Sequence, residues 1–189
     1  MIKAARSLAG SANMRSLLGA AAVALGLFTS SPALSQDSNT EYKLKAALIY
    51  KLPKFVRWPH GNSSDTPFGL CLVGENRFQG ALRSLEGLAV NARRIELRQI
   101  DLDELESSRC EMLFISASLD DQLPELLERL SGKPIMSVSD MEGFAERGGG
   151  IEIARAENRL NFRINLESVR QGGLEVAAPL LDLATIVEG

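Results

Sequence analysis

Histidine is almost absent from this chain: among its 189 residues there is one, His60. Catalysis of the Ser-His or Cys-His type needs a base beside its nucleophile, so the sequence permits at most one such site. His60 lies in the polar stretch HGNSSDT and could act only if Ser137, Ser139 or a cysteine came close to it in space. A solvated loop histidine is the simpler interpretation, and a hydrolase that uses His60 is the weakest functional hypothesis.

Motifs for metals and nucleotides are missing as well. Two cysteines and one histidine cannot build the usual zinc ligand set. The acidic run 101–106 lacks the central glycine of a calcium loop, which favours a solvated acidic face. The turn 74–76, Gly-Glu-Asn, has neither a Walker lysine nor the three-glycine dinucleotide fingerprint. The sequence therefore predicts no catalytic residue, no metal site and no cofactor.

Acidic residues outnumber basic ones, 24 against 21, and three of the basic ones lie near the amino terminus. Lys3, Arg6 and Arg15 accompany an apolar run over 17–28, and Ala33-Leu34-Ser35 has the small-x-small pattern of a signal cleavage site. We therefore expect residues 1–35 to be an export signal cleaved near Ser35, which predicts a periplasmic protein. An amphipathic anchor or a retained membrane helix is the alternative.

The expected mature chain, residues 36–189, is long enough for one domain with a substantial core. The signal holds three of the 21 basic residues and no acidic one, which leaves 18 against 24 and a net charge of −6. Nucleic-acid binding needs a positive surface that neutralises phosphates, so this charge argues against it. It also argues against an anionic membrane surface as the main partner.

Both cysteines, Cys71 and Cys110, belong to the expected exported part. An oxidising compartment favours a disulfide between them, and two free thiols buried inside strands are the alternative. In the chain-entropy model a bond that closes a loop of about 40 residues stabilises a domain by about 4 kcal/mol.

The stretch EYKLKAALIYKLPKFVRWP, residues 41–59, opens this part and predicts an amphipathic helix. Its apolar residues recur at three- and four-residue steps, which keeps them on one face; they are Tyr42, Leu44, Ala47, Leu48, Leu52, Phe55 and Val56. The lysines, including Lys45, are expected on the other face. Pro53 predicts a kink or a break into two short helices, and Trp58-Pro59 ends the element.

The remaining pattern alternates strands with helices and predicts an α/β fold. Strands are expected over 68–73, 94–100, 112–115 and 134–139, with helices over 77–85, 119–130 and 141–147. A hairpin is expected over 151–164, a helix capped by Asn165, and a last apolar helix over 174–187. The fold class is thus a largely parallel central sheet with helices on both faces and a closing antiparallel hairpin at an edge.

Two apolar regions are candidates for binding a partner protein. The end of the opening helix combines aromatics with arginine, the composition of interface hot spots, and the last helix is apolar on all sides. The expected contacts are Phe55, Arg57, Trp58, Pro59, Leu174, Val176, Leu180 and Leu181. For Trp58, a place in the core is an equal alternative. A small-ligand pocket is also possible where parallel strands end, near Gly74, Ser116 and Ser139.

Several separated stretches resemble the YfiR-like family. They are EYKLKAALIYKLPKFVRWP, LCLVGENRF, CEMLFIS, IMSVSDMEGFAERGGGI, NRLNFRINLESVR and GGLEVAAPLLDLATIV, and together they extend from Tyr42 to Val187. The resemblance implies an exported, dimeric α/β protein that holds a membrane diguanylate cyclase in check by binding its periplasmic sensor domain. It also implies an outer-membrane peptidoglycan-associated lipoprotein that draws the repressor away.

The resemblance further implies a disulfide between Cys71 and Cys110. Members can carry a second pair near positions 145 and 152, but this chain has Ala145 and Glu152 there. The first functional hypothesis is therefore a non-enzymatic periplasmic repressor of cyclic di-GMP production and biofilm formation. The alternative is a periplasmic small-molecule-binding protein.

Overall fold

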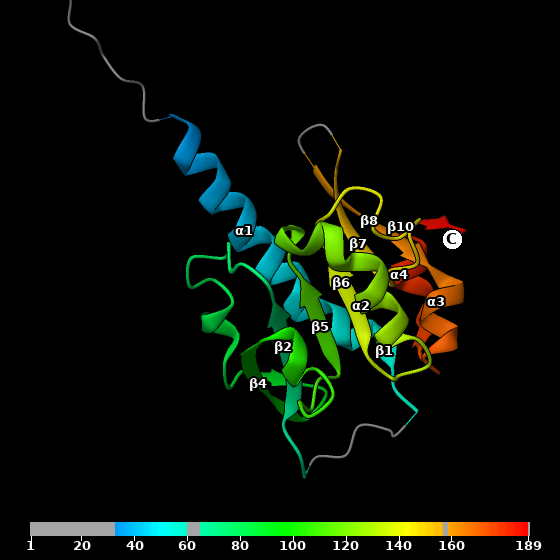
Figure 1. Cartoon of the computed structure of the whole chain (residues 1–189). Helices are drawn as coiled ribbons and strands as arrows, with labels where there is room; N and C mark the ends of the chain where they lie inside the picture. Colours follow the sequence, from blue (N-terminus) through cyan, green and yellow to red (C-terminus); the bar gives the residue numbers. More distant parts are fainter. Residues whose placement is uncertain (1–32, 60–64, 157–158, 189) are drawn as a thin grey trace, which may run out of the picture. The chain divides into compact units, whose positions relative to one another are not determined.

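The computed structural model describes residues 33–59, 65–156 and 159–188, and within them the chain is built on one eight-stranded sheet (Figure 1). The strand order is β10-β8-β7-β6-β5-β2-β4-β3. The strands are β2 (Phe68–Val73), β3 (Ala89–Val90), β4 (Arg93–Ile100), β5 (Met112–Ile115), β6 (Met136–Ser139), β7 (Ile151–Ala156), β8 (Arg159–Asn165) and β10 (Ala184–Val187). A separate two-stranded ribbon pairs β1 (Val56–Arg57) with β9 (Glu175–Val176).

The direction of the strands confirms the predicted fold class. From β4 through β2, β5 and β6 to β7 every neighbouring pair is parallel, and β7 with β8 forms the antiparallel hairpin. β10 then lies parallel to β8 and extends the sheet beyond that hairpin. The outer strands of the sheet, β3 and β10, are short. Its centre consists of β2, β5 and β6, whose residues are all buried.

Helices cover both faces of the sheet because successive residues of a strand point to opposite sides. In β2, Leu70 and Leu72 join the cluster that holds Ile49 of α1 (Ala33–Lys51). Cys71 and Val73 join a second cluster that holds Leu126 of α2 (Leu123–Leu130). Each fully buried leucine contributes about 1.5–3 kcal/mol, so both helices are held by apolar side chains on the two faces of β2.

The opening helix breaks near Pro53, as predicted, but part of its inner face differs. α1 ends at Lys51, and the 3₁₀ helix η1 (Leu52–Phe55) has the proline in its first turn. Leu44, expected inside, is 50% exposed, whereas Lys45, expected outside, is only 5% exposed. The helix turns Lys45 inward because its Nζ lies 2.6 Å from carboxylate oxygens of both Asp140 and Glu41.

The helix predicted over 77–85 is wrong: the structure has successive turns there, followed by the 3₁₀ helix η2 (Arg83–Leu85). Gln79 and Gly80 have φ angles of 48° and 92°, which a right-handed helix cannot contain. The apolar side chains that suggested a helical period are nevertheless buried, namely Phe78, Leu82 and Leu85. The spacing therefore reflected a folded loop with its apolar residues turned inward.

Two other helices differ from prediction. The start of the helix expected over 119–130 belongs instead to the 3₁₀ helix η4 (Ala117–Gln122), whose N-cap is Ser116. Residues 141–147 form turns, not a helix. The carboxylate of Asp140 binds Lys45, and the backbone N–H of Met141 donates to Ser139 Oγ at 3.1 Å.

The largest correction concerns residues 174–187, predicted as one long helix. They form β9, the short α4 (Ala178–Leu181) and β10. The backbone N–H of Ala177 donates to the carbonyl of Phe55 at 2.8 Å beside the β1–β9 pairing, and Ile186 pairs with Ile164 of β8. Apolar residues occur on all sides because three short elements each meet a different neighbour. Pro179 lies in the first turn of α4, where it is tolerated.

The hairpin and the helix after it are confirmed. β7 and β8 pair from Ile151↔Ile164 to Ala156↔Arg159. Asn165 caps α3 (Leu166–Gln171), since its Oδ1 accepts a hydrogen bond of 2.9 Å from the N–H of Ser168. A side-chain oxygen at this position satisfies one of the free N–H groups of the first turn.

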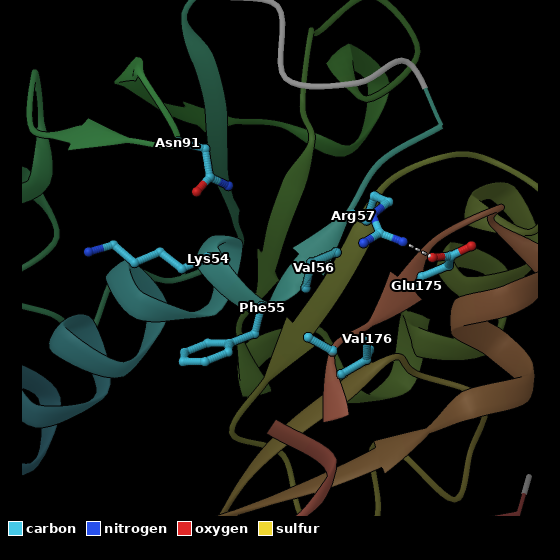
Figure 2. Close-up of a pocket in the computed structure, with 8 residues that line it drawn as sticks. Lys54, Phe55, Val56, Arg57, Asn91, Glu175 and Val176 are labelled. Atoms are coloured by element: carbon cyan, nitrogen blue, oxygen red, sulfur yellow. Dashed lines mark hydrogen bonds and ion pairs between the residues drawn. The ribbon is translucent and has the colours of Figure 1, made fainter. Parts of the chain in front are cut away.

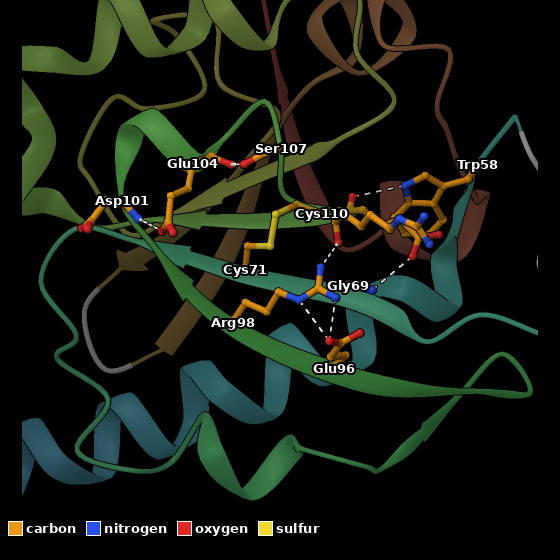
Figure 3. Close-up of a disulfide and its surroundings, with 11 residues drawn as sticks. Trp58, Gly69, Cys71, Glu96, Arg98, Asp101, Glu104, Ser107 and Cys110 are labelled. Carbon is orange, nitrogen blue, oxygen red and sulfur yellow. Dashed lines mark hydrogen bonds and ion pairs between the residues drawn. A yellow bond between two sulfur atoms is a disulfide. The ribbon is translucent and has the colours of Figure 1, made fainter.

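Cys71 of β2 and Cys110, which precedes β5, form a disulfide, as predicted (Figure 3). Their Cα atoms lie 5.7 Å apart. The two segments approach so closely that a Cβ at Gly69 would lie 1.9 Å from the carbonyl oxygen of Arg109. Only glycine fits there, so the backbone contact and the disulfide hold the same pair of segments together.

Ala145 and Glu152, where the family resemblance raised the question of a second cysteine pair, lie in contact. The backbone N–H of Ala145 donates to the buried carboxylate of Glu152 at 3.2 Å, and Asn165 Nδ2 donates to the carbonyl of Ala145 at 2.9 Å. Polar contacts without redox chemistry join these segments in this chain.

Candidate functional site

The β1–β9 ribbon brings together the two apolar regions that the sequence proposed as partner-binding. Val56 stands opposite Val176 in antiparallel register, and Arg57 stands opposite Glu175. Arg57 Nη1 lies 2.6 Å from Glu175 Oε2, with both side chains largely exposed (Figure 2). Segments far apart in the chain thus form one continuous surface, which we call the ribbon surface: Phe55, Arg57, Glu175 and Val176.

A cleft of about 280 Å³ lies along the ribbon surface. Lys54 and Asn91 line it together with the ribbon residues (Figure 2). Asn91 has a φ of 46°, a conformation that asparagine tolerates better than most residues. Its Nδ2 donates to the carbonyl of Pro53 at 2.7 Å. This bond ties the turn between β3 and β4 to η1, so the edge of the cleft is fixed by backbone geometry.

The ribbon surface has the composition of a contact surface for another molecule. Phe55 and Val176 are half-buried, and an exposed ion pair lies next to them. Aromatic and arginine side chains at the centre of a patch, with polar groups around it, are typical of protein interfaces. Among the described residues there is no group of three or more histidine, cysteine, aspartate or glutamate side chains placed to hold a metal ion.

The predicted contact residues divide into exposed and buried ones. Phe55, Arg57, Pro59, Val176 and Leu181 remain partly or fully exposed. Three others belong to the core and cannot be surface contacts in this structure; they are Trp58, Leu174 and Leu180, with exposures of 2–3%.

For Trp58 the alternative reading, a place in the core, is what the structure shows. Its ring meets Phe68 edge to face with centroids 5.3 Å apart, and its Nε1 donates to the carbonyl of Glu111 at 3.2 Å. A buried indole finds a partner for its one N–H in this way. Trp58 therefore anchors the end of β1 to the start of β5.

The residues proposed for a small-ligand pocket lie together at the carboxyl ends of β2, β5 and β6. The two serine side chains make hydrogen bonds within the protein. Ser139 Oγ donates to the carbonyl of Ile115 at 2.7 Å, and Ser116 bonds Ser118. Ser116 and Ser139 are fully buried. A Cβ at Gly74 would lie 2.7 Å from Ser118 Oγ, so the turn after β2 is tightly packed. A ligand role for these residues stays a prediction.

Sequence reasoning did not single out Lys54, Asn91 and Glu175. The signal that could have found Glu175 is its charge opposite Arg57, but this is visible only once the register of β1 and β9 is known. His60, the one candidate base, lies outside the described residues.

Shifted pKa values occur away from the ribbon surface, where α1 meets the end of β6. Burial opposes the charge of Lys45, but hydrogen bonds to Asp140 and Glu41 outweigh it and raise the pKa of the lysine above its ordinary value. Burial and the nearby charge of Asp140 raise the pKa of Tyr42. The lysine ammonium also lies 4.5 Å from the centre of the Tyr42 ring. This cluster fixes the helix to the sheet.

The fold is a disulfide-linked α/β domain with an open cleft along its β1–β9 ribbon. The chain belongs to the YfiR/HmsC-like family (DUF4154), whose model matches residues 42–185. This is a family of periplasmic regulators of cyclic di-GMP signalling. Among the described residues, no helix combines the length and the apolar character needed to cross a membrane.

The chain is also similar to a solved structure, a conserved domain protein from Vibrio cholerae O1 biovar El Tor strain N16961. The TM-score is 0.51 and the sequence identity is 11%, so this likeness concerns the fold alone. The match covers 77% of this chain and 59% of that one, so this chain spans less than two thirds of the length of the Vibrio protein.

Proposed function

We propose that this chain is a periplasmic repressor that binds the periplasmic sensor domain of an inner-membrane diguanylate cyclase. Binding suppresses production of cyclic di-GMP and formation of biofilm. The observation that carries the proposal is the family match over residues 42–185, and the ribbon surface supplies a place where a partner can bind.

The mechanism needs no chemistry in the repressor. A protein that binds one state of a sensor domain shifts the equilibrium toward that state by its difference in affinity for the two states. A preference of about 100-fold, or about 2.7 kcal/mol, is enough to make an inactive state dominant over an active state of equal initial population. The rigid backbone pairing at β1–β9 favours such binding, because little ordering is needed when the complex forms.

Two further partners belong to the proposal. A peptidoglycan-associated lipoprotein of the outer membrane would compete for the repressor and so release the cyclase. A second copy of the chain would form a homodimer. Mass action then sets the output: cyclase activity rises whenever the free repressor falls below its dissociation constant for the sensor.

Deleting the gene in a strain with an intact cyclase tests this function. Cellular cyclic di-GMP and biofilm should rise, and expression of the parent protein should restore both. Complementation with Arg57→Glu, which reverses an exposed charge on the ribbon surface, should fail although the variant is exported at normal abundance. Complementation with Arg83→Glu, the same change at an exposed arginine in η2, should succeed. Unchanged cyclic di-GMP in the deletion strain would contradict the proposal.

A further inference from the structure

A second cleft, larger than the one along the ribbon surface, lies at the amino ends of the parallel strands beside the disulfide. Its volume is about 430 Å³, within the range of pockets that hold small molecules. Pro67 precedes β2, Arg93 begins β4, Glu111 precedes β5 and Ile135 precedes β6, and all four line it. We call it the basal cleft.

The basal cleft is built on a buried ion pair. Arg93 has a side-chain exposure of 6%, and its Nη1 and Nη2 lie 2.5 and 2.6 Å from the two carboxylate oxygens of Glu111. The same guanidinium donates to the carbonyls of Thr66 and Pro67 at 2.8 and 2.6 Å. These two charges neutralise each other and fix the walls of the cleft, so neither charge is available to bind a ligand.

The remaining charges leave the basal cleft positive, although the chain as a whole is negative. Arg98 is paired with Glu96 at 2.6 Å (Figure 3), and Lys133 bonds Glu106, which lies outside the lining. Arg109 is exposed and makes no ion pair with any residue in the described part of the chain. A guanidinium that no described acidic side chain neutralises therefore lines a preformed cleft.

The other side of the basal cleft is apolar. Trp58, Cys110 of the disulfide and Ile135 contribute to it. Figure 3 shows Trp58 on one side of Cys110 and the Arg98–Glu96 pair on the other. A cleft with apolar walls and few convergent polar groups matches a ligand that has an apolar body and one charged group.

We infer that the basal cleft binds a small organic anion whose carboxylate or phosphate is held by Arg109, with support from Lys133. The apolar body of the ligand lies against Ile135, next to the largely buried Trp58 and Cys110. Arginine suits this role because its planar donors match both head groups in a bidentate arrangement. The cleft lies on another part of the molecule than the ribbon surface, and the inference does not rest on the proposed repression of a cyclase.

Trp58 gives the test its readout, since it is the one tryptophan of the chain and lines the basal cleft. Its fluorescence would be followed while the purified protein is titrated with benzoate, with phenyl phosphate, and with benzamide as the neutral counterpart of benzoate. Both anions should give a saturable change in fluorescence, and their affinity should fall as the salt concentration is raised. Benzamide should bind at least about tenfold more weakly, and the tighter anion identifies the preferred head group.

Arg109→Glu, at an exposed position, should weaken binding of both anions by about tenfold or more. Arg83→Glu carries the same charge change away from the basal cleft and should bind as the parent does. Circular dichroism of both variants would establish that they are folded. The inference is overturned if benzamide binds as tightly as benzoate, if Arg109→Glu binds as tightly as the parent, or if neither anion gives a saturable change.

Discussion

Arg57 and Glu175 lie 118 residues apart in the chain, yet their side chains meet at 2.6 Å across the β1–β9 ribbon. The ribbon joins the end of the opening helix to the segment before the last strand, and neither segment has another β-partner there among the described strands. The surface that supports the proposed function is therefore created by tertiary pairing and is absent from either segment alone.

The Arg57–Glu175 ion pair is predicted to matter little for stability. Both side chains are largely exposed, and such pairs contribute about 0–1 kcal/mol. A double-mutant cycle with Arg57→Ala and Glu175→Ala, measured by urea unfolding, should give a coupling energy below about 1 kcal/mol. A coupling of several kcal/mol would show that the ribbon depends on this pair and that substitutions at Arg57 test folding rather than binding.

The Cys71–Cys110 disulfide is predicted to stabilise the domain substantially. It closes a loop with a sequence separation of 39, which corresponds to about 4 kcal/mol in the chain-entropy model. The double variant Cys71→Ser with Cys110→Ser should therefore unfold at lower denaturant and accumulate to lower abundance in the periplasm. Thiol labelling of the native parent protein gives an independent check, because full labelling of both cysteines would mean that the bond does not form.

Trp58 is predicted to be a residue of the core, so its loss should act through stability. Trp58→Ala should cost about 3–5 kcal/mol, as other large-to-small changes of buried aromatics do. Trp58→Phe keeps much of the packing and removes one hydrogen bond to the carbonyl of Glu111, which still accepts from the N–H of Met136 at 2.8 Å, so a smaller loss of about 0.5–1.5 kcal/mol is expected. Urea unfolding measures both, and a near-parental stability of Trp58→Ala would contradict the burial of this side chain.

Lys45 is predicted to hold α1 on the sheet through Asp140. Lys45→Met would leave the buried carboxylate of Asp140 without its cation, at a cost of about 3–5 kcal/mol. Lys43→Met, an exposed lysine two residues away, should change stability by less than about 0.5 kcal/mol. Similar losses in the two variants during chemical unfolding would contradict this role.

The pKa of Lys45 sets the pH dependence of this contact. Because the pKa is raised in the folded protein, its contribution is fully present below the ordinary value of 10.5 and is lost as pH rises through the folded value. The stability lost by Lys45→Met relative to the parent should therefore be constant across neutral pH and shrink only in strongly alkaline solution. A difference that already disappears near neutral pH would contradict the assignment.

The sequence predicted the central sheet because β2 and β5 are short apolar runs bounded by turn residues, a signal that depends on few long-range contacts. It could not predict the position of Lys45, since its burial depends on Asp140, 95 residues away. The segment 174–187 was assigned to a helix for a related reason. Its apolar residues are compatible with a helix when the segment is considered alone. In the fold, backbone pairing with β1 and β8 outweighs this local preference.

The candidate site was predicted in part. Aromatic and arginine composition drew attention to Phe55 and Arg57, and apolar content to Val176, and all three remain partly or fully exposed. Composition alone cannot distinguish a buried Trp58 or Leu180 from an exposed neighbour. That distinction depends on which side chains face β5 and the core, a tertiary fact. The same limit applied to Ser116 and Ser139, whose hydroxyls could be assigned to internal hydrogen bonds only from the fold.

Binding of the purified exported chain to the isolated periplasmic domain of the cyclase, measured by isothermal titration calorimetry, tests the central claim most directly. The parent and Arg83→Glu should bind with equal affinity, whereas Arg57→Glu and Leu181→Glu, both folded by circular dichroism, should lose affinity by about tenfold or more. Absence of binding by the parent protein, or parental affinity in both Arg57→Glu and Leu181→Glu, would contradict the account.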